Sequence, residues 1–356
     1  MRKKRTKFIL AVLLPLQYLA LLLLRQFPEF VETVYSNGFF PFFSTILRYT
    51  FGWVPFSVGD VLYTLMGIYL IRWFFKNYKR VVRGPRGFLL DILASVSVIY
   101  FIFNLMWGLN YYRPPLHKSL ELDRDYTTEE LLEITEVLIE RANALHRELG
   151  YADSTKIELP YDQKQIFESS LDGYHELTKI HPELSYRALS LKKSGWSLGL
   201  TYMGYSGYYN PLTGEAQVNN LIKTYKFPVV AAHEQAHQLG YAAENEANFI
   251  ATLATIHNPD PYIKYTGYIF VLRYCINELA RRDIDSYRRL LPTVNFGILE
   301  SYREMREFWA SYENPLEDVS KLFWDQFLKA NNQQQGIMSY SYMVALVVNY
   351  FEKHPL

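Results

Sequence analysis

The chain has 356 residues, of which 49% are apolar and 17% aromatic, and its formal net charge is +1. This balance offers no basic excess for binding nucleic acid and no acidic tail. Cys275 is the single cysteine, which excludes an internal disulfide and a thiolate-rich metal site.

Three long apolar segments in the first third of the chain predict transmembrane helices at about residues 8–25, 58–75 and 88–112. Each can span roughly 30 Å of hydrocarbon, and their charged residues fall near the ends. The first segment follows a basic N-terminus, as a signal peptide would, but no small-residue cleavage site comes after it. We therefore expect an uncleaved helix and a membrane domain over residues 1–112. Buried core helices of a soluble protein are the alternative.

Basic residues predict how these helices are oriented. The loop between the second and third segments contains Lys76, Lys79, Arg80, Arg83 and Arg86. Because Lys and Arg concentrate in cytoplasmic loops, this loop and the N-terminus are expected in the cytoplasm. The loop of residues 25–57 and everything after the third helix then lie outside. Trp107, Tyr111 and Tyr112 are expected to form an outer aromatic belt.

Residues 113–356 are numerous enough for one substantial extracytoplasmic domain. Thr127 and Glu130 precede an apolar-periodic stretch as a capping box would, and Pro228 is expected to open a further helix. The elements expected in chain order are a helix at 131–149, a helix at 163–180, a loop with short strands at 182–205, two strands around a turn at 207–218, and mainly helices thereafter.

The most informative motif is His233-Glu234-Gln235-Ala236-His237. Residues four apart share one face of a helix, so both imidazoles can bind one metal ion. Glu234 would stand beside them, where it can take a proton from a metal-bound water. Two ligands and a general base in five residues are typical of zinc peptidases. The alternative is a solvated helix that carries two histidines by chance.

A catalytic zinc site needs a third protein ligand and one open position for water. Gly240 is expected to end the motif helix, and a second apolar-periodic segment begins at residue 242. Glu244, in the first turn of that second helix, is the expected third ligand, and Glu246 is the alternative. Either carboxylate could instead be an ordinary first-turn residue favoured by the helix dipole. Asn248 could hydrogen-bond a ligating histidine from behind.

The two motifs together resemble the gluzincin branch of the zincin metallopeptidases, where His-Glu-x-x-His precedes Glu-x-x-x-Asn or Glu-x-x-x-Asp on the next helix. The resemblance implies a zincin-like fold, with Glu244 as the third ligand and Asn248 at the later acidic or amide position. The gap from His237 to Glu244 is much shorter than in thermolysin-like enzymes.

Most of the chain after residue 88 is similar to a family of bacterial membrane proteins known only as a domain of unknown function (family 3810). The stretches that carry this similarity are Trp-Gly-Leu-Asn-Tyr-Tyr-Arg (107–113), Asn-Pro-Leu-Thr-Gly-Glu-Ala (210–216), the His-Glu-x-x-His block, and Gly-Ile-Met-Ser-Tyr (336–340). This similarity implies a zincin-like fold but brings no known substrate.

The expected architecture is a mainly α membrane protein, with three N-terminal transmembrane helices followed by an α+β zincin-like extracytoplasmic domain. The expected function is a membrane-anchored zinc-dependent hydrolase, a metallopeptidase that cleaves a peptide or protein substrate outside the cytoplasmic membrane. His233, His237 and Glu244 would hold Zn²⁺, with Glu234 as base. The alternative is a catalytically silent zinc-fold binding or scaffold protein of the cell envelope, but a purely structural site needs no base. The expected partners are the lipid bilayer and the substrate, and not nucleic acid.

A few further residues are candidates for the site because of where they lie in the sequence. Tyr340 is the candidate to stabilise the oxyanion, with simple packing as the alternative. The strand edge within residues 207–218 could bind an extended peptide through main-chain hydrogen bonds. Glu215 could orient a substrate amine or a ligating histidine, or face water. His257 precedes Asn-Pro and is expected to cap a helix rather than to bind metal.

Overall fold

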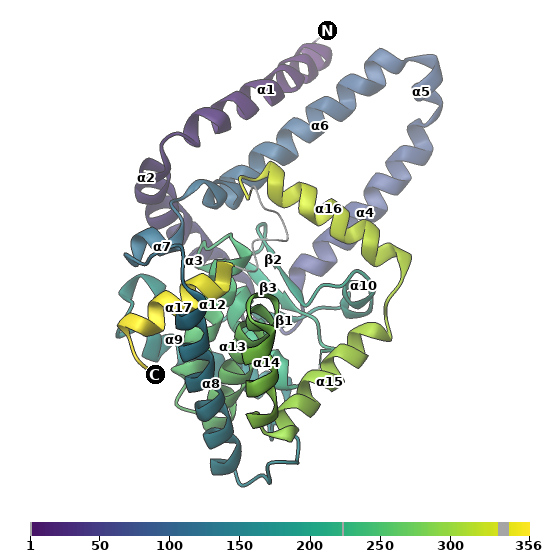
Figure 1. Cartoon of the computed structure of the whole chain (residues 1–356). Helices are drawn as coiled ribbons and strands as arrows, with labels where there is room; N and C mark the ends of the chain where they lie inside the picture. The colour runs from purple at the N-terminus through teal and green to yellow at the C-terminus, as the bar shows by residue number, and fades with distance from the viewer. Residues whose placement is uncertain (1, 223, 334–341) are drawn as a thin grey trace.

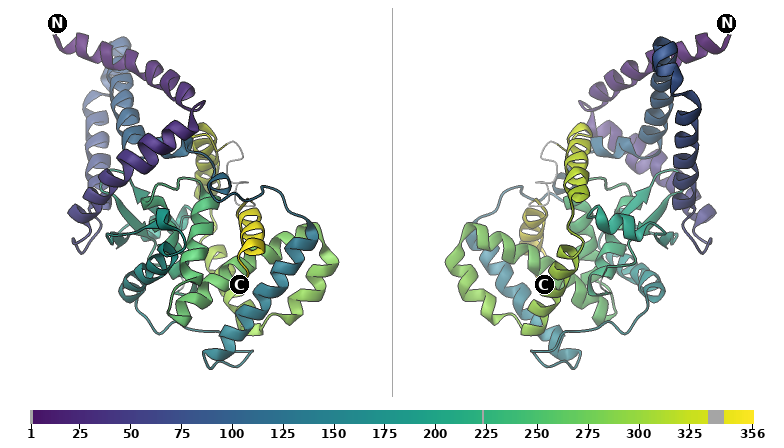
Figure 2. Two further views of the ribbon diagram at one scale, coloured as in Figure 1. Left: turned by 90° about the vertical axis from the view of Figure 1, so that its left-hand side faces the viewer. Right: turned by 90° about the vertical axis from the view of Figure 1, so that its right-hand side faces the viewer.

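The computed structural model describes residues 2–222, 224–333 and 342–356. The protein is mostly helical and contains one three-stranded sheet, in agreement with the sequence (Figure 1). Three long apolar helices project from one end of the molecule, and the helical body that carries the sheet lies at the other end (Figure 2).

The three projecting helices are long and apolar enough to cross a membrane: α1 (Arg2–Leu24), α4 (Val58–Asn77) and α6 (Pro85–Met106). The third ends at Met106 rather than at residue 112. α1 packs along α6, where Gln17 Nε2 donates to Ser97 Oγ at 2.9 Å. α4 and α6 diverge from the short helix α5 (Lys79–Arg83) toward the helical body (Figure 1).

The chain after α6 forms a short 3-10 helix, η2 (Gly108–Tyr112), instead of continuing α6 to residue 112. Trp107 and Tyr111 are each 5% exposed and Tyr112 is 7% exposed, and they pack in one core cluster with Phe40. The expected outer aromatic belt is therefore wrong. Tyr and Trp combine a large apolar area with a polar tip, and this suits a buried cluster as well as a membrane interface.

The segment between α1 and α4 is helical and packs on the body. It comprises α2 (Pro28–Phe30), the π-helical η1 (Val31–Phe39) and α3 (Phe40–Phe51). Ser44 Oγ donates to the carbonyl oxygen of Gln238 at 2.9 Å, and the guanidinium of Arg48 lies 4.7 Å from the ring centre of Tyr186. Contacts therefore cross the domain boundary predicted at residue 112.

The body is built around α12 (Glu244–Ile256), which is buried along nearly all of its length. It packs against α11 (Phe227–Gln238), α13 (Pro261–Arg282), α9 (Gln163–Thr178) and α17 (Tyr342–Lys353), while α8 (Thr128–Glu148) packs on α13. The predicted capping box of α8 is confirmed, since the Thr127 hydroxyl accepts the N–H of Glu130 at 3.1 Å and Glu130 Oε2 accepts the N–H of Thr127 at 2.7 Å.

The sheet contains β1 (Leu191–Lys193), β2 (Gly207–Asn210) and β3 (Glu215–Val218) in the order β1-β3-β2. β2 and β3 form the predicted antiparallel hairpin, β1 runs parallel to β3, and β2 lies at an edge. The sheet packs on α11. The region predicted as a loop with short strands also contains a helix, α10 (Ser197–Tyr202), whose Gly- and Ser-rich surroundings concealed it.

The remaining elements are α7 (Leu116–Ser119), η3 (Pro182–Leu184), η4 (Thr224–Lys226), α14 (Ile284–Leu290), η5 (Leu291–Thr293), α15 (Phe296–Ala310) and α16 (Pro315–Ala330). Of these, α16 lies at the end of the body from which the apolar helices project, where Phe327 packs against Phe103 of α6 (Figure 1).

Candidate metal centre

Helix α11 carries the His-Glu-x-x-His motif, and its boundaries follow from local sequence. Pro228 stands in its first turn, where the missing N–H leaves no hydrogen bond unmade. The helix ends before Gly240, whose φ of +91° is the left-handed conformation of a C-terminal cap. The N–H of Tyr241 donates back to the carbonyl of Ala236 at 3.2 Å and reverses the chain. The predicted end of the motif helix is confirmed.

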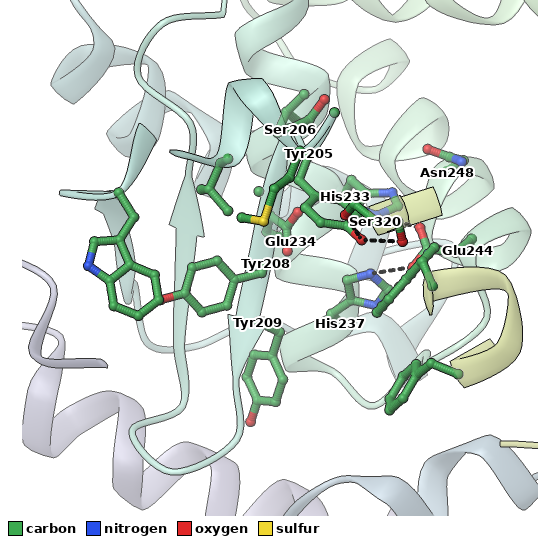
Figure 3. Close-up of a pocket in the computed structure, with 18 of the residues that line it drawn as sticks. Tyr205, Ser206, Tyr208, Tyr209, His233, Glu234, His237, Glu244, Asn248 and Ser320 are labelled. Carbon is green, nitrogen blue, oxygen red and sulfur yellow. Dashed lines mark hydrogen bonds and ion pairs between the residues drawn. The ribbon is translucent and has the colours of Figure 1, made fainter. Parts of the chain in front are cut away.

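This reversal brings the first residue of α12 against the two histidines. His233 Nε2 lies 3.3 Å from Glu244 Oε2, and His237 Nε2 lies 3.7 Å from Glu244 Oε1 (Figure 3). The candidate ligand atoms of the three residues all lie within 4.8 Å of one another. Ligand atoms on a tetrahedral zinc ion, about 2.0–2.1 Å from the metal, are roughly 3.4 Å apart, so this donor set fits one ion.

His237 is oriented for coordination by its own backbone. Its Nδ1 lies 2.7 Å from the carbonyl oxygen of Tyr241 and so carries the ring proton, which leaves the lone pair of Nε2 directed at Glu244. Burial, aided by the neighbouring His233, lowers the pKa of His237 to about 4. The neutral imidazole that a metal ion requires is therefore the favoured form.

His233 lies in a more anionic environment. Burial opposes its protonation, but hydrogen bonding and charge from Glu244, with smaller contributions from Glu234 and Asn248, raise the pKa of His233. An environment that favours a positive charge at this ring equally favours a metal cation between the ring and the carboxylate. Asn248 lines the same cavity from α12 (Figure 3).

Glu246 points away from this cluster. Its carboxylate accepts the N–H of Leu116 at 2.7 Å and lies near Arg113. Burial raises the pKa of Glu246 to about 7, against the opposing effects of these two neighbours. The structure thus brings Glu244, rather than Glu246, to the histidines, and coordination of an ion by Glu244 stays a prediction.

Glu234 packs its carboxylate against the edge strand β2. A Cβ atom on Gly207 would lie 2.5 Å from Glu234 Oε1, so the glycine makes room for the carboxylate. Oε2 of Glu234 is buried and accepts no hydrogen bond from the described residues. Burial raises the pKa of Glu234 to about 8, although His233 opposes the shift. A carboxyl group with a pKa near neutrality is suited to take up and return a proton.

The three candidate ligands and Glu234 line a cavity of about 900 Å³. Its opposite wall comes from distant parts of the chain: Tyr63 of α4, Phe103 of α6, Tyr208 of β2, and Trp324 and Phe327 of α16. A cavity of this size and apolar lining can hold a short segment of a larger substrate.

The other predicted site residues have different outcomes. Tyr340 lies outside the described residues. Glu215 neither faces water nor approaches the candidate metal ligands, because its buried carboxylate accepts the N–H groups of Val58 at 3.1 Å and Gly59 at 2.6 Å. It therefore caps the start of α4, where the helix dipole favours a negative charge. His257 is the C-cap residue of α12, as predicted.

Tyr205 is a site residue that the sequence did not single out. Its hydroxyl accepts a hydrogen bond from Ser320 Oγ at 2.7 Å, donates to the carbonyl oxygen of Ser320 at 3.3 Å, and lies in the cavity near the candidate metal ligands (Figure 3). Burial raises the pKa of Tyr205 against the effect of Ser320, and the charge of Glu244 adds to the rise. Tyr205 is one of 30 tyrosines and lies in a turn without a motif, so only the fold reveals its position.

Comparison with known proteins yields one match. Residues 35–348 match the family described as "Protein of unknown function (DUF3810)". No curated protein and no solved structure matches the chain. The matched region contains α4, α6, the sheet, and the α11–α12 corner that carries the candidate ligands.

Proposed function

The chain belongs to the DUF3810 family, whose description names no activity, and we propose from the geometry of its site that it is a membrane-anchored zinc metallopeptidase. The observation that carries the proposal is the cluster of His233, His237 and Glu244, open to a cavity that Glu234 also lines. A structural zinc site would usually close its fourth position with another protein ligand. Among the described His, Cys, Asp and Glu side chains, the cluster contains three members and no fourth.

Glu234, Tyr205 and Ser320 all line the cavity and have roles in this proposal. Zinc bound there would polarise the scissile carbonyl and make a water molecule nucleophilic near neutral pH. Glu234 accepts the proton of the attacking water and returns it to the leaving amine, so that the amide is converted to a carboxylic acid and an amine. Tyr205 turns its hydroxyl proton from the Ser320 carbonyl oxygen to the substrate carbonyl oxygen as negative charge develops there, while Ser320 Oγ holds the hydroxyl in place.

The peptidase class is supported by two features. One is the resemblance of the motif pair to the gluzincins. The other is β2, an edge strand beside Glu234, whose free main-chain groups can align an extended peptide.

The location follows from the basic residues. We propose that α1, α4 and α6 span the cytoplasmic membrane, with the N-terminus and the α4–α6 connection in the cytoplasm. Lys7 of α1 and Arg80 of α5 both pair with Asp91 of α6, at 2.5 and 2.9 Å, which joins these helices on the proposed cytoplasmic side. The metal centre then lies outside the membrane, next to the outer ends of α4 and α6.

The test uses the full chain purified in detergent, with its metal content and its hydrolysis of unfolded casein measured in parallel. We expect about one zinc per chain, and hydrolysis that a chelator abolishes and added zinc restores. Glu234→Gln is the matched control, because it should keep the metal and lose hydrolysis. A wild-type chain that holds zinc but cleaves no peptide would favour the silent binding or scaffold protein, and a chain without metal affinity would reject both.

A further inference from the structure

The wall of the cavity opposite the metal ligands is built from the outer ends of two membrane helices. Tyr63 lies about 8 Å along α4 from its first residue, and its ring centre lies 6.3 Å from those of Tyr208 and Trp196. Trp196 Nε1 also donates to Thr64 Oγ1 at 3.1 Å. On the other side, Phe103 of α6 lines the same cavity. The cavity therefore reaches the level at which α4 and α6 enter the bilayer.

Helix α4 is held firmly in this position. Asp60, in its first turn, accepts a hydrogen bond from the hydroxyl of Tyr208 on β2 and from the N–H of Gly195 at 2.7 Å. Glu215 binds the first two N–H groups of the same helix. These buried contacts join α4 to the sheet that borders the metal centre, so the helix and the site form one unit.

Helix α16 completes the wall and has two apolar sides. One side lines the cavity, where Phe327 contacts Phe103 of α6 with ring centres 5.9 Å apart. The other side is exposed and carries Leu316, Val319 and Leu322, which are 53%, 64% and 63% exposed. Phe323, also exposed, lies at the border of the two sides and lines the cavity as well. Charged residues occupy the remaining face, including Asp318 and Lys321. A helix with an exposed apolar face and a charged face is typical of one that lies in the membrane interface.

We infer that α16 rests in the outer surface of the bilayer, and that the metal centre takes its substrate from there: a polypeptide held in the membrane by its own apolar segment and cleaved just outside it. This inference rests on the proposed peptidase function. The bilayer is the occupant that the structure favours for the exposed face of α16, because that helix lies at the end of the body from which the apolar helices project (Figure 1) and packs on α6 through Phe327 and Phe103. The exposed apolar residues of α4 and α6, such as Met66 and Ile102, are further surface that the same bilayer would cover.

The position of the site explains why a membrane-held substrate would be preferred. A polypeptide confined to the bilayer meets the cavity at a high effective concentration, whereas a soluble peptide must reach a cavity next to the membrane surface from bulk water. The edge strand β2 would align the stretch just outside the membrane anchor, and the aromatic wall would hold its apolar side chains.

The first experiment places α16 relative to lipid without using catalysis. Val319→Cys and Asp318→Cys are made in the full chain, labelled with a fluorophore, and reconstituted in phosphatidylethanolamine–phosphatidylglycerol vesicles that contain brominated lipid. Cys275 is fully buried and can stay. We expect strong quenching at position 319 and little at its neighbour 318. Equal weak quenching at both positions, or cross-linking of position 319 to a second copy of the chain, would overturn the membrane contact.

The second experiment tests the substrate class. Two fluorogenic polypeptides share one cleavable stretch, and one of them also carries an apolar anchor of about 20 residues in the same vesicles. We expect the anchored form to be cleaved at least about tenfold faster at equal total concentration. Val319→Asp should lower this rate severalfold and leave cleavage of the soluble form unchanged, while Asp318→Asn should change neither.

The outcomes separate the two proposals. Equal, chelator-sensitive cleavage of both polypeptides would reject the membrane-held substrate and leave the peptidase standing. If the zinc-loaded protein cleaves neither polypeptide, the peptidase and its substrate class both fall. Release of fatty acid from the vesicle lipids, without peptide cleavage, would replace the polypeptide by a lipid and overturn the inference.

Discussion

The two halves of the candidate site differ in how the chain builds them. The ligand half is local, since His233, Glu234, His237 and Glu244 lie on one helix, a glycine turn and the first turn of the next helix. The opposite wall combines α4, α6, β2 and α16, which come from widely separated parts of the sequence. Local backbone geometry positions the residues of the ligand half, whereas the positions of the wall residues depend on how distant elements of the fold pack together. Changes to the ligand half should therefore remove the metal or the chemistry, whereas changes to the wall should alter what the site accepts.

The largest effect is expected from His237→Ala, which removes a proposed zinc ligand. We expect zinc affinity to fall by more than about 100-fold, the upper range for residues that only support a ligand, and hydrolysis to disappear with it. Metal analysis after dialysis, together with the casein assay, measures both. A variant that keeps stoichiometric zinc would contradict the ligand assignment and break the proposed division of the site.

Glu234→Gln should separate metal binding from chemistry within the ligand half. The amide has nearly the same shape but cannot accept the proton, so we expect hydrolysis to fall by about 10²–10⁴-fold while zinc content stays unchanged. Parallel measurement of zinc content and hydrolysis checks this result. Hydrolysis at the wild-type rate would exclude Glu234 as the base.

The same division explains how much could be predicted from the sequence. The motif helix, its end at Gly240 and the first turn of α12 depend on helical periodicity and on a glycine that accepts a positive φ, both visible in a few residues. Tyr205, Tyr63 and Phe327 are ordinary aromatic residues until the fold brings them to one cavity.

Two errors in the sequence reading have the same origin. The sequence predicts Trp107 in a membrane interface, and Glu215 beside a substrate amine or a ligating histidine or in water, but long-range packing buries both residues in other roles. Phe40, which packs with Trp107, and the start of α4, which Glu215 caps, both lie far away in the sequence. The local sequence around Trp107 and Glu215 therefore shows their chemical character, but it does not show which part of the fold they contact.

The two acidic residues of α12 should respond differently to replacement. Glu244→Ala should weaken zinc binding far more than Glu246→Ala, because the Glu246 carboxylate is occupied by the N–H of Leu116. Glu246→Ala should instead lower stability by about 1–3 kcal/mol, since that N–H would be left buried without a partner. Zinc titration and thermal unfolding distinguish the two effects, and a greater loss of zinc affinity in Glu246→Ala would reverse the assignment of the third ligand.

Asn248→Ala should lie between these two variants. The side chain favours the charged form of His233 and is not itself in the ligand cluster. Loss of such a supporting group usually costs about 10- to 100-fold in metal affinity. The same zinc titration measures it, and an affinity equal to that of the wild type would show that Asn248 does not support His233.

Gly207→Ala tests the point at which the two halves meet. The new Cβ would lie 2.5 Å from Glu234 Oε1 and 2.6 Å from the carbonyl oxygen of Gln217, so both the base and the edge strand must shift. Misplacement by about 1 Å can cost roughly 100-fold in rate, and we expect a loss of about 10- to 100-fold in kcat with zinc content unchanged. Gly199→Ala is the matched control, because a Cβ there meets nothing within 4 Å. If kcat in Gly207→Ala equals that of the control, the contact between β2 and Glu234 has no part in catalysis. If Gly207→Ala loses zinc as well, β2 also holds the proposed metal ligands in place. The ligand half and the opposite wall would then depend on each other, although they come from separate parts of the chain.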